Sequence, residues 1–220
     1  MFMKALIFDL DGTLLDTLKD LAVSTNHVLE NNGYPPHPLE AYNYLVGQGV
    51  RHLIEYALPR EAREARRIDR LVQEFSAYYE GHWDVHTHPY DGIREMLDRL
   101  FQTGRPIGIL SNKPHNFTVL CVDKMLAGYP FKLVMGHREP FPRKPDPQSA
   151  LHMARELNLA PREIMFCGDT SIDMQTATRA GMYAVGVTWG FRPRGELLEN
   201  GARQLAESPA DVITIFNAAE

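Results

Sequence analysis

The fold is first indicated by the segment Ala5-Leu6-Ile7-Phe8-Asp9-Leu10-Asp11-Gly12, in which four apolar residues are followed directly by two acidic residues and a glycine. An apolar run without polar alternation predicts a strand covered on both faces, as in a parallel sheet flanked by helices. The same pattern returns, strongly or weakly, at 106–110, 132–135, 164–167, 184–187 and 212–215. We therefore predict a sheet built from these strands.

Apolar residues at helical spacing separate several of these runs. They lie over 93–102, 147–157 and 172–180, and Gly104 and Gly181 follow the first and last of these segments as stop signals. Strands that alternate with helices are typical of an α/β fold with a doubly wound, Rossmann-like parallel sheet.

The segment 16–88 differs from the rest, because it has apolar stripes at helical spacing and no strand-like run. We predict an all-helical insertion over 16–88, inside an α/β core domain formed by 1–15 and 89–220. The core would then have an ordinary domain size.

Composition excludes several classes of function. The 220 residues include 28 acidic and 23 basic side chains, and a net charge of −5 argues against a nucleic-acid partner. Two cysteines suit a reducing compartment and do not suit a disulfide scaffold. No run approaches the roughly 18 apolar residues of a membrane span, and Asp9 and Asp11 interrupt the first run too early for an export signal. We expect a cytoplasmic protein, monomer or homodimer, that does not act on membranes.

Polar residues follow three of the predicted strands, at the edge of a parallel sheet where ligands bind. They are Asp9 and Asp11, Ser111 and Asn112, and Asp169 with Asp173, and Lys144 lies in a proline-flanked loop before a predicted helix. Converging carboxylates repel one another, and a hard divalent cation such as Mg²⁺ relieves the repulsion. A carboxylate is also a nucleophile toward phosphorus, and a hydroxyl and an ammonium group can hold phosphoryl oxygens.

Four segments resemble, in order, the motifs of the haloacid dehalogenase superfamily. They are Asp9–Leu14, Ser111–Lys113, Lys144–Pro145 and Gly168–Asp173. The insertion resembles the helical cap domain of that superfamily. Within it, the segments 46–49, 111–114 and 187–191 resemble those of phosphoglycolate phosphatases, and the resemblance extends over nearly the whole chain.

The resemblance implies a role for each matching residue. Asp9 would be the nucleophile and an Mg²⁺ ligand, and Asp11 the general acid and base, with its backbone carbonyl on the metal. Asp169 would be a further ligand, and Asp173 would hold metal-bound water. Ser111, Asn112 and Lys144 would bind the phosphoryl group. The implied reaction is Mg²⁺-dependent hydrolysis of a small phosphomonoester, phosphoglycolate by preference, through an aspartyl-phosphate.

Other interpretations stay open at this point. Gly47 and Arg51, in the predicted cap, are candidates for binding the glycolate end, although a turn between helices explains the glycine equally well. His82, His86 and His88 are either a metal site or a polar hinge. The same motifs also fit a pyrophosphatase, a nucleotidase or a sugar-phosphate mutase such as β-phosphoglucomutase. A different class is a non-catalytic binding protein on the same fold.

Overall fold

The computed structural model describes residues 3–218, so the outermost residues of the predicted core, 1–2 and 219–220, lie outside the described part. The chain divides into two compact units. One consists of Met1–Leu15 with Pro89–Glu220, and the other is Asp16–His88. Each unit is described by itself.

The larger unit is built on a six-stranded sheet with the order β5-β4-β1-β6-β7-β8, in which every neighbouring pair is parallel. The strands are β1 (Ala5–Phe8), β4 (Ile107–Pro114), β5 (Leu133–His137), β6 (Ile164–Gly168), β7 (Tyr183–Val187) and β8 (Gln204–Ala206). The chain leaves β1 toward β4 and β5 on one side and later returns toward β6 on the other. This reversal confirms the predicted doubly wound α/β fold, and ligands of such sheets bind where the strand order reverses.

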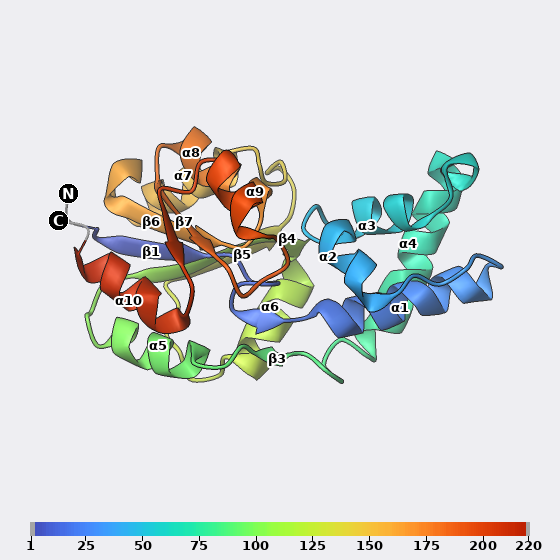
Figure 1. Cartoon of the computed structure of the whole chain (residues 1–220), viewed down its shortest axis with the longest axis horizontal. Helices are drawn as coiled ribbons and strands as arrows, with labels where there is room; N and C mark the ends of the chain where they lie inside the picture. The colour runs from blue at the N-terminus through green and yellow to red at the C-terminus, as the bar shows by residue number, and fades with distance from the viewer. Residues whose placement is uncertain (1–2, 219–220) are drawn as a thin grey trace. The chain divides into compact units, whose positions relative to one another are not determined.

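Helices cover both faces of the sheet (Figure 1). One face carries α5 (Ile93–Phe101), α6 (His115–Met125) and α10 (Pro209–Ala218), and the other carries α7 (Gln148–Glu156) and α8 (Ser171–Ala180). The short η3 (Pro161–Glu163) precedes β6, and α9 (Arg194–Glu199) precedes β8.

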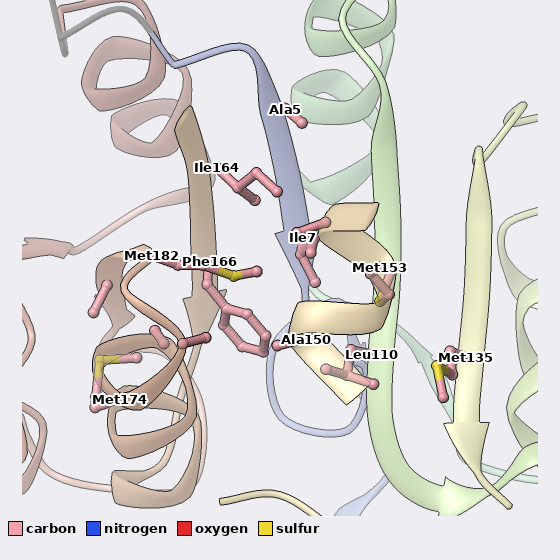
Figure 2. Close-up of a cluster of buried hydrophobic side chains, with 14 of the residues drawn as sticks. Ala5, Ile7, Leu110, Met135, Ala150, Met153, Ile164, Phe166, Met174 and Met182 are labelled. Atoms are coloured by element: carbon pink, nitrogen blue, oxygen red, sulfur yellow. The ribbon is translucent and has the colours of Figure 1, made fainter. Parts of the chain in front are cut away.

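The unbroken apolar runs have a direct structural cause. Ala5 and Ile7 belong to the core cluster that includes Phe166 of β6 and Met153 of α7 (Figure 2). Leu6, the alternate residue on β1, is also completely buried. Successive side chains of a strand point to opposite faces, so both faces of β1 are covered and both demand apolar residues.

The prediction of a strand at 212–215 is wrong, because these residues lie within helix α10. Val212, Ile213 and Phe216 are buried at helical spacing. The carboxylate of Asp211 accepts hydrogen bonds from the backbone N–H groups of Glu207 and Ser208, which satisfies donors at the start of the helix. A short β-branched run fits a strand and a buried helix equally well, and the edge position is taken by β8 instead.

The smaller unit is helical, as predicted, apart from its ends. It contains α1 (Leu18–Asn31), η1 (Leu39–Ala41), α2 (Tyr42–Leu45), α3 (Val50–Ala57), η2 (Arg60–Ala62) and α4 (Ala65–Glu80). Its core is formed by buried residues of α1, α3 and α4, including Leu29, Ile54 and Leu71. At its two ends the chain forms the short strands β2 (Leu15–Asp16) and β3 (His88–Pro89), which pair with each other.

A buried carboxylate ties the beginning of this unit to its end. Asp20, in the first turn of α1, is 2% exposed. Its oxygens accept hydrogen bonds from the backbone N–H groups of His86, at 2.9 and 3.0 Å, and Thr87, at 2.8 Å, and from the Thr87 hydroxyl at 2.8 Å. These donors are 66 and 67 residues away in sequence. Asp20 therefore holds the returning segment against the start of α1.

We predict that Asp20→Ala destabilises the helical unit. The substitution leaves the part-buried N–H of His86 and two buried donors of Thr87 without this partner, and each buried loss costs about 1–3 kcal/mol. Urea unfolding followed by the fluorescence of Trp83, in a Trp189→Phe background, reports on this unit. Asp69→Ala is the matched control, because Asp69 pairs with Arg51 on an exposed surface. Equal stability of the Asp20 and Asp69 variants would show that the Asp20 bonds stabilise nothing.

Candidate active site

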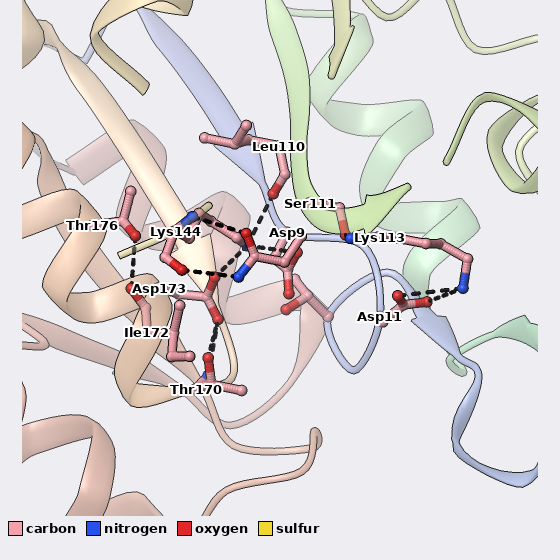
Figure 3. A network of polar contacts seen from close by, with 12 residues as sticks. Asp9, Asp11, Leu110, Ser111, Lys113, Lys144, Thr170, Ile172, Asp173 and Thr176 are labelled. Carbon is pink, nitrogen blue, oxygen red and sulfur yellow. Dashed lines mark hydrogen bonds and ion pairs between the residues drawn. The ribbon is translucent and has the colours of Figure 1, made fainter. Parts of the chain in front are cut away.

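A single buried ammonium group joins two carboxylates at the carboxyl edge of the sheet (Figure 3). Lys144 Nζ lies 2.8 Å from Asp9 Oδ1 and 2.6 Å from Asp173 Oδ1, and it donates to the Leu110 carbonyl at 3.0 Å. Asp9 directly follows β1, and Asp173 lies in the first turn of α8. Residues that are far apart in the sequence thus meet at the Lys144 ammonium group, as expected for residues at the carboxyl ends of neighbouring strands.

The backbone of Lys144 is held as firmly as its side chain. The Asn112 amide donates to the Lys144 carbonyl at 3.0 Å and accepts from its backbone N–H at 2.8 Å. Asn112 thus uses both ends of its amide on the loop that carries Lys144. These two bonds position Lys144, and the predicted contact of Asn112 with substrate stays a prediction.

Asp169 is completely buried where β6 ends. Its Oδ1 accepts from the Thr13 hydroxyl at 2.9 Å, and its Oδ2 accepts from the Phe191 backbone N–H at 2.9 Å. Gly12 adopts a positive φ of 87°, and a side chain at Gly12 or Gly190 would overlap Asp169. The two glycines therefore let both loops approach this carboxylate closely.

Asp173 is fixed by the helix that it begins. Thr170 donates to Asp173 Oδ2 from its backbone N–H at 3.1 Å and from its hydroxyl at 2.6 Å. This is a capping box at the N-terminus of α8. One oxygen of Asp173 thus caps the helix, while the other contacts Lys144.

Burial and mutual repulsion perturb these acids strongly. Burial raises the pKa of Asp9 well above its usual range; repulsion from Asp173 and Asp169 adds to the rise, while Lys144 opposes it. Burial, and then the charge of Asp173, raises the pKa of Asp169 to about 7. Burial acts to lower the pKa of Lys144, but Asp173 and Asp9 outweigh it and raise that pKa.

The three carboxylates fit a divalent cation. One oxygen each of Asp9, Asp169 and Asp173 lie within 4.8 Å of one another, and all three residues are buried. Within residues 3–218, this is the one group of three or more acidic, His or Cys side chains with that proximity. Hard oxygen donors suit Mg²⁺, and a cation here would relieve the repulsion that adds to the effect of burial on the pKa values of Asp9 and Asp169.

Asp11 stands apart from this group, and its partner was missed by the sequence analysis. Lys113 Nζ lies 3.1 Å from Asp11 Oδ1 and 3.4 Å from Oδ2. Figure 3 shows this pair set apart from Asp9, Lys144 and Asp173. Lys113 belongs to the second motif, but the sequence pattern does not assign it a role. Its position beside Asp11 depends on how β1 and β4 pair.

The structure brings most of the predicted site residues together at one edge of the sheet. They are Asp9, Asp11, Ser111, Asn112, Lys144, Asp169 and Asp173. Sequence reasoning also missed Thr13, Thr170 and Phe191 as partners of the acids, although the spacing of Thr170 and Asp173 is a capping-box signal.

The remaining predicted residues lie in the helical unit. Gly47 adopts a positive φ in the loop between α2 and α3, and the guanidinium of Arg51 pairs with Asp69 of α4. His82 and His88 each place Nδ1 against a backbone carbonyl.

Among the described residues, no helix is long and apolar enough to cross a membrane.

Comparison with known proteins identifies the family. The model of the haloacid dehalogenase-like hydrolases matches residues 6–187. Phosphoglycolate phosphatase of Pseudomonas putida is 34% identical, over 98% of this chain and 78% of that protein. N-acetylmuramic acid 6-phosphate phosphatase of Pseudomonas aeruginosa is 28% identical, over 100% of this chain and 97% of that protein.

A solved structure gives the same result. A protein of Lactobacillus delbrueckii subsp. bulgaricus, provisionally assigned as a phosphoglycolate phosphatase, superposes with a TM-score of 0.91. It is 27% identical, and the match covers 99% of this chain and 100% of that one. The chain therefore belongs to the haloacid dehalogenase-like hydrolases, and it is a phosphatase of that family.

The raised pKa of Asp169 predicts a pH dependence of stability. The pKa of Asp169 is about 7 in the folded state and about 3.9 in the unfolded state. The folded state therefore holds the proton of this carboxyl group more tightly. Without metal, this contribution is full at low pH and is lost as the pH rises through about 7. Asp169→Asn removes the titration. In EDTA, wild type should therefore lose stability relative to the variant between pH 4.5 and 8.

Urea denaturation of both proteins across that pH range measures the difference. Adding Mg²⁺ at pH 8 should restore the advantage of wild type, since the cation favours the ionised group. A stability difference that does not vary with pH in EDTA would contradict the assigned environment of Asp169.

Proposed function

We propose that the protein is an Mg²⁺-dependent phosphomonoester hydrolase that works through an aspartyl-phosphate on Asp9, with phosphoglycolate as its substrate. The observation that carries the proposal is the buried Lys144 ammonium, which lies against Asp9 where β1 ends. It supports a carboxylate held for attack, with a fixed positive charge beside it for the oxygens of a phosphoryl group.

The reaction divides into two steps. An oxygen of Asp9 attacks phosphorus while the ester bond breaks, and Asp11 gives a proton to the departing alcohol oxygen. Water then attacks the phosphorus of the aspartyl-phosphate, Asp11 takes the proton of that water, and Asp9 is released. Lys144 and the Ser111 hydroxyl hold phosphoryl oxygens in both steps. When bound at the three carboxylates, Mg²⁺ supplies positive charge to those oxygens.

Formal charge supports the requirement for a cation. Four carboxylates, from Asp9, Asp11, Asp169 and Asp173, face two ammonium groups, from Lys113 and Lys144. The net formal charge of these six groups is −2, which repels an anionic phosphate ester. One divalent cation offsets that charge. The backbone carbonyl of Asp11 stays the predicted further ligand.

Two substrates have specific support. The name of the Pseudomonas putida relative supports phosphoglycolate. N-acetylmuramic acid 6-phosphate is the second candidate, because its Pseudomonas aeruginosa phosphatase aligns with this chain from end to end. Both molecules carry a carboxylate besides the phosphate. We propose that Arg51, with the Gly47 loop, recognises this carboxylate, and that the Arg51–Asp69 pair yields to it.

We predict Mg²⁺-dependent release of phosphate, which EDTA abolishes and which Asp9→Asn lacks, because the amide cannot attack phosphorus. The substrate panel is phosphoglycolate, N-acetylmuramic acid 6-phosphate, pyrophosphate, nucleotides, sugar phosphates and p-nitrophenyl phosphate. Asp123→Asn, on the exposed surface of α6, is the matched control. Full activity in excess EDTA would contradict the requirement for a metal ion, and an active Asp9→Asn protein would contradict the assignment of Asp9 as the nucleophile.

The same panel separates the rival functions. A sugar-phosphate mutase would isomerise its substrate when given a bisphosphate primer and would release little phosphate. A pyrophosphatase or a nucleotidase would prefer those substrates over phosphoglycolate. A binding protein would release phosphate from none of them.

Arg51→Ala tests specificity, because it should impair phosphoglycolate hydrolysis much more than hydrolysis of p-nitrophenyl phosphate.

A further inference from the structure

Asp11 differs from the other three acids in how it is held. Asp169 and Asp173 each receive hydrogen bonds on both oxygens, and Asp9 is bound by Lys144. Within residues 3–218, the Asp11 carboxylate is bound by the Lys113 ammonium alone. The direction in which this carboxylate points therefore depends on one ammonium group.

Lys113 is itself firmly placed. Its side chain is 4% exposed, whereas that of Asp11 is 13% exposed. Its backbone N–H donates to the Ser111 hydroxyl at 3.2 Å, and its carbonyl accepts from the Thr118 hydroxyl at 3.2 Å. Because the aliphatic part of the side chain is buried and the backbone is hydrogen-bonded at the end of the strand, Lys113 has less rotamer freedom than a surface lysine. Its ammonium group therefore keeps one position.

The two lysines of the site serve different acids. Lys144 contacts Asp9 and Asp173, while Lys113 contacts Asp11, and Figure 3 shows the two groups apart. Lys113 lies between Leu110 and Pro114, where the register of β4 against β5 shifts. Removing Lys113 takes an ammonium group away from Asp11 and leaves the contact between Lys144 and Asp9 in place.

We propose that Lys113 is a positioning residue that fixes the direction in which Asp11 presents its carboxyl group to the leaving-group oxygen. This inference rests on the proposed phosphatase reaction. General acid catalysis contributes about 10²–10⁴-fold and requires the acid within hydrogen-bond reach of its target. A displacement of about 1 Å can cost about 10²-fold. Without Lys113, the Asp11 carboxylate would turn freely about its side-chain bonds.

The proposal has a consequence that depends on the leaving group. An alkoxide is a poor leaving group and needs a proton as the ester bond breaks, whereas p-nitrophenolate is stable as an anion near neutral pH. A misplaced Asp11 should therefore slow the first step with alkyl phosphates and spare it with p-nitrophenyl phosphate. A residue that only supports the fold, or only adds positive charge to the site, would affect all substrates alike.

The experiment compares three substrates in rapid-quench single turnovers. Phosphoglycolate has a carboxylate and an alkoxide leaving group, and 2-hydroxyethyl phosphate has the same kind of leaving group without the carboxylate. p-Nitrophenyl phosphate has neither. Lys113→Met should slow both alkyl phosphates by about 10–10²-fold, with the first release of p-nitrophenolate changed by less than about threefold. Lys113→Arg should restore part of the loss, and Lys132→Met, on an exposed surface, should match wild type.

Each other outcome overturns the proposal. Equal losses with all three substrates would give Lys113 a general electrostatic or structural role. A loss confined to phosphoglycolate would make it a binder of the substrate carboxylate. A crystal structure of Lys113→Met is independent of turnover: an Asp11 side chain in its wild-type orientation would also refute positioning. If wild type hydrolyses none of the substrates, the proposed function fails, and the crystal structure still decides the role of Lys113.

Discussion

The contact between the Lys144 ammonium and the carboxylates of Asp9 and Asp173 is the constraint on which the site depends. Three acids are buried within a few ångströms of one another, and burying charge without a partner is costly. Lys144 offsets part of that cost, and Asn112 holds its backbone in place. Burial, together with the remaining repulsion, still raises the pKa of Asp9 and Asp169, which makes the arrangement receptive to a divalent cation.

The fold makes this concentration of charge possible. The central strand β1 pairs with β4 on one side and β6 on the other, so their carboxyl ends deliver acids, a hydroxyl and an amide to one edge. The apolar parts of the same strands are buried on both faces and form a rigid base. Glycines at 12 and 190 then admit two loops against Asp169. A stable sheet thus supports a site that is electrostatically unfavourable by itself.

Sequence patterns predict the parts of this structure that depend on local chemistry. An apolar run that ends in Asp9 identifies both a buried strand and its functional edge. Local patterns fail where distant contacts decide: the run at 212–215 fits a strand and a helix, and packing selects the helix. The bonds of Asp20 reach donors 66 and 67 residues away. The contact between Lys113 and Asp11 follows from strand pairing, which a one-dimensional pattern does not contain.

In the proposed reaction Asp9 becomes phosphorylated while Asp11 transfers the proton, and intact mass spectrometry detects that phosphorylation. In the proposed reaction, Asp11→Asn removes the base for the second step, whereas the first step with p-nitrophenyl phosphate needs little acid. Mixing this variant with that substrate in Mg²⁺ should release a burst near one equivalent of p-nitrophenolate and add one phosphoryl group to the protein. Steady turnover at the wild-type rate, with no gain in mass, would contradict an aspartyl-phosphate on Asp9.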